Sequence, residues 1–166
     1  MKTLLLISVL GLAQIASAYT PEQFCARYTI PEAYNECRAI IFHGHFQQST
    51  LLACDRYNSQ WEGNRCLRAI KNRRFDERAV RECDRYNDAR YGTECFAIVA
   101  DWYMQRKAVS VCARYNKLAE GNECFSIIAG RIFDLADLEY CDSLATGAAG
   151  NECLRSCAPP ERYPLP

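Results

Sequence analysis

The sequence contains few of the residues from which metal and catalytic centres are usually built. It has two histidines, His43 and His45, and no pair of cysteines with the Cys-x2-Cys spacing of a typical zinc site. Residues two apart point to different sides of a helix, so the histidines are not expected to share a metal ion. A catalytic site needs a nucleophile, a base and an electrophilic partner that converge, and no such set stands out. We therefore expect no cofactor, no metal and no enzymatic activity.

Neither sign of charge is in excess, and long apolar runs are lacking. The chain of 166 residues carries 20 Lys and Arg against 20 Asp and Glu. Because nucleic-acid-binding domains normally have a clear basic excess, no nucleic-acid partner is expected. After Ala18, no segment approaches the roughly 20 apolar residues of a membrane span.

The first residues have the pattern of a secretory signal peptide. Lys2 provides the positive start, the segment 4–15 is mostly apolar, and Ala16-Ser17-Ala18 fits a small-x-small cleavage site. The apolar run is too short for the alternative, a transmembrane anchor. We expect residues 1–18 to be removed and the protein to be secreted or periplasmic.

Cysteine is abundant, and its spacing is periodic. The 11 cysteines stand at 25, 37, 54, 66, 83, 95, 112, 124, 141, 153 and 157, with alternating separations of 12 and 17 residues up to Cys153. A fixed period of this kind, here 29 residues, marks a stacked repeat architecture. So many cysteines behind a signal peptide indicate a disulfide framework in an oxidising compartment.

The residues around the cysteines repeat as well. The first cysteine of a unit opens a Cys-x-Arg-Tyr motif, at Cys25–Tyr28, Cys54–Tyr57, Cys83–Tyr86 and Cys112–Tyr115, while the fifth unit has drifted to Cys141–Leu144. Each unit indicates two short helices, with Thr20, Asp76 and Asp134 as N-caps of first helices. The Asn or Thr before each Glu-Cys pair is expected to cap the second helix, and the preceding glycine to suit the turn.

The predicted fold is all-α: a solenoid-like array of five 29-residue, disulfide-stapled helical hairpins. The repeat domain covers 19–158, with units that start near 25, 54, 83, 112 and 141, and a proline-rich C-terminal tail follows at 159–166.

Two disulfide connectivities are possible. The favoured one closes each hairpin, as Cys25–Cys37, Cys54–Cys66, Cys83–Cys95, Cys112–Cys124 and Cys141–Cys153. The alternative links the second cysteine of one unit to the first of the next and leaves Cys25 unpaired, and sequence alone does not decide between them. Cys157 is either a free thiol in a core position, in a monomer, or the link of a disulfide-bonded dimer.

The repeated arginines and tyrosines have a structural interpretation. We expect the Cys-x-Arg-Tyr arginines to pair with the glutamates beside the partner cysteine, such as Glu36, and the tyrosines to belong to the core. The alternative is a ladder of arginine donors for an anionic ligand.

Positions that differ between units are the candidates for recognition, because shared positions build the scaffold. Near the far end of each second helix the units carry Gly44/His45, Arg73/Arg74, Trp102/Tyr103 and Arg131/Ile132. Trp, Tyr and Arg are enriched at binding hot spots. Together with Trp61 in the turn of unit two, we predict that Arg73, Arg74, Trp102, Tyr103 and Arg131 contact a partner. The alternative is ordinary packing or solvated surface.

With its signal peptide, paired cysteines and stacked α/α units, the chain resembles the Sel1-like repeat proteins in architecture. Those repeats are longer, with a closer cysteine pair and an Ala/Gly-rich consensus, so no functional residue is carried over. The resemblance implies a scaffold that binds proteins or peptides, and more distantly an action on cell-wall compounds. We therefore predict a scaffold that binds a protein, peptide or glycan partner. The alternatives are a small cell-wall-directed enzyme or enzyme inhibitor, and a purely structural envelope component.

Overall fold

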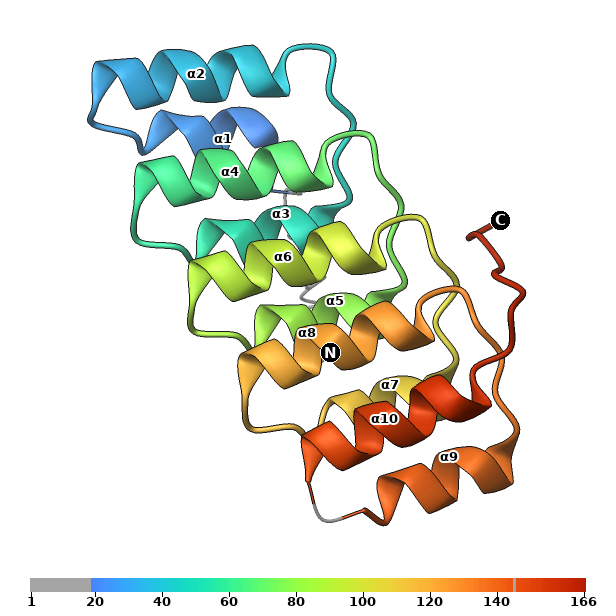
Figure 1. Ribbon diagram of the computed structural model, residues 1–166. Helices are drawn as coiled ribbons and strands as arrows, with labels where there is room; N and C mark the ends of the chain where they lie inside the picture. The colour runs from blue at the N-terminus through green and yellow to red at the C-terminus, as the bar shows by residue number, and fades with distance from the viewer. Residues whose placement is uncertain (1–18, 145) are drawn as a thin grey trace, which may run out of the picture.

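The computed structural model describes residues 19–144 and 146–166, so the predicted signal peptide lies outside the described residues. The described chain forms ten α-helices and no β-strand. They are α1 (Pro21–Ala26), α2 (Pro31–Ile41), α3 (Gln48–Asp55), α4 (Gln60–Ile70), α5 (Glu77–Asp84), α6 (Ala89–Val99), α7 (Arg106–Cys112), α8 (Leu118–Ile128), α9 (Leu135–Asp142) and α10 (Gly147–Cys157). Consecutive helices pair as five antiparallel hairpins, which confirms the predicted all-α array of stapled repeats (Figure 1).

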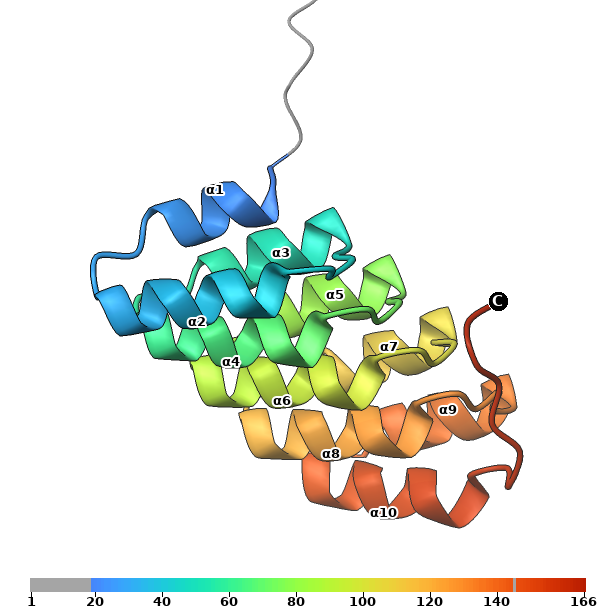
Figure 2. The same cartoon turned by 90° about the horizontal axis from the view of Figure 1, so that it is seen from above.

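The hairpins stack into two layers of helices. The even-numbered helices, each of 11 residues, pack side by side in one layer, and the shorter odd-numbered helices form the other (Figures 1 and 2). Helices of this length are marginal alone in water, so packing between the layers must hold them. The core between the layers contains fully buried side chains such as Phe24, Leu67, Phe96 and Phe125.

A disulfide closes every hairpin, as the favoured connectivity predicted. The five bridges are Cys25–Cys37, Cys54–Cys66, Cys83–Cys95, Cys112–Cys124 and Cys141–Cys153, with Cα–Cα distances of 5.5–5.7 Å. The alternative that links neighbouring units is therefore wrong. A bridge across a loop of this length stabilises a fold by roughly 3 kcal/mol. Cys157 is half-buried and forms no disulfide within the chain.

Neighbouring hairpins interlock through a tyrosine and a glycine. The tyrosines Tyr28, Tyr57, Tyr86 and Tyr115 pack onto Gly63, Gly92, Gly121 and Gly150 of the next unit, where a Cβ atom would overlap the tyrosine oxygen. These glycines were expected in turns, but they lie inside helices, because the helices begin earlier than the sequence suggested. The glycine is thus required by a close approach between units.

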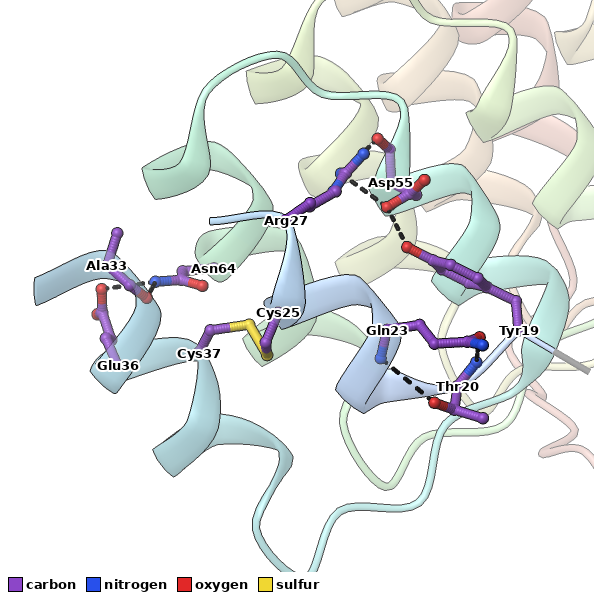
Figure 3. Close-up of a disulfide and its surroundings, with 10 residues drawn as sticks. All are labelled: Tyr19, Thr20, Gln23, Cys25, Arg27, Ala33, Glu36, Cys37, Asp55 and Asn64. Atoms are coloured by element: carbon purple, nitrogen blue, oxygen red, sulfur yellow. Dashed lines mark hydrogen bonds and ion pairs between the residues drawn. A yellow bond between two sulfur atoms is a disulfide. The ribbon is translucent and has the colours of Figure 1, made fainter. Parts of the chain in front are cut away.

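The asparagine next to this glycine also joins two units. Asn64, Asn122 and Asn151 are buried in helices, and their Nδ2 atoms donate to the carbonyl oxygens of Ala33 (2.9 Å), Tyr91 (3.0 Å) and Glu120 (3.0 Å) of the preceding unit. Figure 3 shows the first of these contacts beside the Cys25–Cys37 bridge. Their expected role as N-caps is therefore wrong.

The observed N-caps stand farther upstream. Ser59, Asp88 and Thr146 cap α4, α6 and α10. The predicted caps Thr20, Asp76 and Asp134 are confirmed.

The repeated arginines also connect neighbouring units, but with partners other than those expected. Arg27 pairs with Asp55 at 2.7 Å (Figure 3), and the equivalent pair Arg56–Asp84 repeats this one unit later. The expected partner Glu36 instead accepts from Asn64 of the next unit. Surface ion pairs of this kind stabilise by at most about 1 kcal/mol, so they contribute little to holding the array together.

The interlock is missing at both ends of the array. The position of the receiving glycine is Tyr34 in the first unit, and the position of the inserting tyrosine is Leu144 in the fifth. Tyr34 is exposed, so the first unit presents a large side chain where the other units have the glycine. Terminal repeats of solenoids commonly differ from internal ones in this way, because they cap the stack.

Candidate functional site

Four loops that join one hairpin to the next lie along one edge of the array. They cover 42–47, 71–76, 100–105 and 129–134, and together they are called the loop edge below. The turns within hairpins lie at the opposite edge, called the turn edge. In Figure 1 the loop edge is on the right, where the C-terminal tail runs beside it.

One residue of each loop has a left-handed backbone. These residues are His43 (φ 53°), Asn72 (φ 59°), Asp101 (φ 65°) and Gly130 (φ 73°), and they follow the 29-residue period. Each lies just after the C-cap of an even-numbered helix, where this conformation commonly ends a helix. Asn, Asp and His adopt it more readily than other residues with side chains, and glycine adopts it freely.

The side chain of this residue fastens its loop to the preceding one. The backbone amide of Asn72 donates to the His45 carbonyl oxygen at 2.9 Å, and its side-chain oxygen Oδ1 accepts from the backbone amide of His45 at 2.8 Å. Asp101 repeats the pair with Arg74, at 2.7 Å and 2.8 Å. Each pair of hydrogen bonds thus satisfies both the backbone amide and the carbonyl oxygen of the residue in the preceding loop.

The junction between the third and fourth loops departs from this pattern. The Gly130 amide still donates to the Tyr103 carbonyl oxygen, at 2.9 Å, but glycine has no side chain to accept from the Tyr103 amide. That amide instead donates to the carbonyl oxygen of Tyr163 in the C-terminal tail, at 3.1 Å. The Tyr163 amide in turn donates to the Gly130 carbonyl oxygen at 2.6 Å. The tail backbone thus takes the place that an Asn or Asp side chain has in the other loops.

Gly130 makes room for the tail. A Cβ atom at this position would lie 3.2 Å from both the nitrogen and the oxygen of Tyr163 and 2.7 Å from Trp102 Cε3. Any side chain here would therefore displace the tail or the tryptophan.

The tail then continues in an extended form towards the second loop. The Leu165 amide donates to the Asp101 carbonyl oxygen at 2.8 Å, and Pro164 forms an antiparallel β-bridge with Trp102. The Arg74 guanidinium donates to the carbonyl oxygens of Leu165, at 2.8 Å, and of Pro166. Tail residues thus contact three of the four loops.

The prolines of the tail match its hydrogen-bond pattern. Along an extended chain, alternate residues direct their amides to the same side, and here Tyr163 and Leu165 face the loop edge. Pro164 and Pro166 occupy the intervening positions, at which no amide is needed. Proline is tolerated in an extended segment where the missing amide would face solvent, and it blocks the addition of another strand on that side.

The loop edge carries several arginines in different environments. Arg73 pairs with Asp101 at 2.8 Å, and the Arg162 guanidinium of the tail lies 5.6 Å from the centre of the Trp102 ring. Burial, with a smaller contribution from Arg162, lowers the pKa of Arg131. Arg131 donates to the Ile127 carbonyl oxygen, while its buried Nε has no hydrogen-bond partner among the described residues.

The structure brings most of the predicted binding residues together. Arg73, Arg74, Trp102, Tyr103 and Arg131 all lie in loops of the loop edge, and not on the helices where the sequence had placed them. Trp61 lies apart from them, in the first turn of α4 at the turn edge, with 50% of its surface exposed.

The residues that hold the tail were not predicted from the sequence. Gly130, Tyr163 and Leu165 were not singled out, although glycine at 130 breaks the series of His, Asn and Asp at equivalent positions. That exception was the available sequence evidence that the fourth loop has a different neighbour.

Among the described residues, no group of three or more His, Cys, Asp or Glu side chains could hold a metal ion, and no helix has the length and hydropathy to cross a membrane. The chain matches no protein-family model, no curated protein and no solved structure. The architectural resemblance to Sel1-like repeats therefore stays a prediction.

Proposed function

We propose that this protein is a secreted scaffold that binds an extended segment of a partner protein or peptide on its loop edge. The observation that carries the proposal is the tail itself. Residues 163–166 lie extended against three loops and form backbone hydrogen bonds with Tyr103, Gly130 and Asp101. The five disulfides support secretion, because such bridges persist in oxidising compartments.

The pattern of donors and acceptors favours a polypeptide over a glycan. The loop edge offers the Tyr103 amide and the carbonyl oxygens of Gly130 and Asp101, and alternate residues of an extended chain match them. Added strands are a recurrent mode of peptide recognition, in which main-chain hydrogen bonds give affinity and neighbouring side chains give specificity. Here Trp102, Arg74 and Arg131 lie beside the backbone groups and would provide the specificity.

The tail is held weakly enough to be exchanged. A neutral hydrogen bond contributes a net of about 0.5–1.5 kcal/mol and one from a charged group such as the Arg74 guanidinium about 1.5–3 kcal/mol, while ordering the backbone of one residue costs about 1–2 kcal/mol. The tail has five such bonds to the loop edge, and Tyr163, Pro164 and Pro166 remain exposed. The gain therefore exceeds the cost by no more than a few kcal/mol, so the tail occupies the site but a partner segment can compete for the same groups.

A selection experiment tests the proposal. A random-peptide phage library is selected on the immobilised, oxidised chain, and the enriched peptides are measured against Arg74→Ala, Trp102→Ala and the control Trp61→Ala. We expect binding to fall at least tenfold for the two loop-edge variants and to stay unchanged for the control at the turn edge. Peptides that depend on Trp61 alone, or a library without enriched binders, would contradict the proposed site.

The second proposed class, a cell-wall-directed enzyme or inhibitor, has no observation of its own in the described residues. It differs from the scaffold in one measurable respect, because an enzyme would turn over purified peptidoglycan fragments. The scaffold proposal predicts that no fragment is converted.

A further inference from the structure

We infer that the C-terminal tail, 159–166, is an internal competitor that occupies the site of a proline-containing extended segment of a partner protein. This inference rests on the proposed function and specifies the chemistry of the partner. In the tail's register, the partner would place residues with free amides at the positions of Tyr163 and Leu165, and prolines at the positions of Pro164 and Pro166.

The loop edge selects a bound segment by the direction and spacing of its backbone amides. The Asp101 carbonyl oxygen accepts from Leu165, and the Gly130 carbonyl oxygen accepts from Tyr163, two residues earlier in the tail. A segment with proline at either of these positions would lose a donor. A segment with proline between them loses nothing, and proline favours the extended form before binding.

The fourth loop leaves a backbone amide for a separate segment to satisfy. In the second and third loops the left-handed residue supplies its own acceptor, from Asn72 and Asp101. Gly130 supplies none, so the Tyr103 amide depends on a segment that arrives from outside the loop. The loop that lacks a side-chain acceptor is therefore the loop against which the tail lies.

The side chains next to the tail also fit an extended segment with prolines. Trp102 is half-buried, Arg162 of the tail lies over its ring, and Arg74 donates two hydrogen bonds to the carbonyl oxygens at the far end of the tail. Aromatic side chains such as Trp102 commonly line the grooves in which proteins bind proline-rich segments. The partner therefore resembles the tail: an aromatic residue, proline, an aliphatic residue and proline.

The test uses the full chain with single substitutions in the tail. Leu165→Pro removes the amide that donates to Asp101, whereas Pro164→Ala, at the adjacent position, removes no hydrogen bond. The probe is a peptide with the sequence of residues 159–166 that carries fluorescein on its N-terminal amine, measured by fluorescence anisotropy. We expect Leu165→Pro to bind it at least tenfold more tightly than the wild type, and Pro164→Ala to remain within threefold of the wild type.

A third variant tests the role of the fourth loop directly. Gly130→Asn gives this loop the residue that Asn72 has in the second, at a φ of 73° that asparagine tolerates. Its side chain would accept from the Tyr103 amide and fill the place of the tail. We expect faster tryptic cleavage between Arg162 and Tyr163 in both Leu165→Pro and Gly130→Asn, but peptide binding only in Leu165→Pro.

The outcomes separate this inference from the proposed function. Equal peptide affinity in the wild type and Leu165→Pro, with a lowered melting temperature in the variant, would show that the tail only seals the edge and would overturn the inference. Light scattering that shows tail-exchanged dimers of the wild type would overturn it as well. If library-selected ligands need Arg74 but contain no proline and do not compete with the tail peptide, the inference fails while the proposed function stands.

Discussion

The contact between Tyr57 and Gly92 allows the interlock between units to be measured. Gly92 lies inside α6, and a Cβ atom there would overlap the Tyr57 oxygen, while the next nearest atom, Tyr57 Cζ, would be 3.2 Å away. In an exposed helix interior, Gly→Ala stabilises by about 1 kcal/mol through helix propensity. Here Gly92→Ala must displace a half-buried ring, and overpacking of this kind costs about 1–3 kcal/mol. We therefore expect Gly92→Ala to lower the free energy of unfolding by up to about 2 kcal/mol. If the overpacking costs only about 1 kcal/mol, it cancels the gain from helix propensity and the free energy stays unchanged.

The partner substitution changes the sign of the effect. Tyr57→Phe removes the oxygen that the new Cβ would meet, so Gly92→Ala in that background should be neutral or should stabilise by up to about 1 kcal/mol. The assay is a double-mutant cycle by urea unfolding of the oxidised protein. Gly147→Ala is the comparison, because its Cβ would overlap only the flexible end of Glu120 and would lie 3.3 Å from Tyr115 Cγ, clear of any tyrosine oxygen. If Gly92→Ala has the same effect with and without the Tyr57 hydroxyl, the explanation of the glycine by close approach is refuted.

Three further predictions concern the termini of the array, its tyrosines and its thiol. Tyr34→Gly combined with Leu144→Tyr gives the first unit the glycine and the fifth unit the tyrosine of the contact between units. The double variant should therefore form head-to-tail oligomers in sedimentation velocity, and each single variant should not. Burial raises the pKa of Tyr28 and Tyr86 to about 12, above the ordinary value of 10.0. The unfolded chain therefore loses these protons first, so stability is full below pH 10 and falls between pH 10 and pH 12. Tyr86→Phe should reduce that slope by at most about 1.4 kcal/mol per pH unit. Non-reducing peptide mapping after alkylation should return the five hairpin bridges and an alkylated Cys157, whose pKa is raised by burial, so that it reacts slowly at neutral pH; intermolecular peptides of Cys157 would instead show a dimer.

The periodic features could be predicted from the sequence because they depend on local rules. The separation of 12 residues between cysteines fits one helical hairpin, so the unit and the all-α class could be predicted, and the hairpin bridge was the favoured of two connectivities. The caps at Thr20, Asp76 and Asp134 followed from residues directly before the helices. Each of these predictions involves residues close together in the chain.

The errors arose where one unit contacts the next. Gly63 and Asn64 are residue types typical of turns and helix N-caps. In the structure, however, Tyr28 packs onto Gly63, and Asn64 donates to the Ala33 carbonyl oxygen. The composition of a single unit does not show which residues of the neighbouring unit lie opposite. Arg27 was assigned to Glu36 of its own unit for the same reason, whereas it reaches Asp55.

The candidate site was only partly predictable. The variable positions Arg74, Trp102, Tyr103 and Arg131 were found because they depart from the repeat, and the structure places all four on the loop edge. The path of the tail depends on backbone hydrogen bonds, such as that from Tyr163 to Gly130, which leave no pattern in side-chain composition.

The position of the disulfides has a mechanical consequence. Every bridge lies within a hairpin, at a sequence separation of 12, and none joins one unit to the next. When the chain is pulled from its ends, units can separate one by one, but each can extend only through the 17 residues between one bridge and the next. At roughly 3.5 Å per extended residue, that is about 60 Å per unit. The extension of the oxidised array under load is therefore limited by its bridges. Reducing the bridges would increase this maximum extension without breaking the chain.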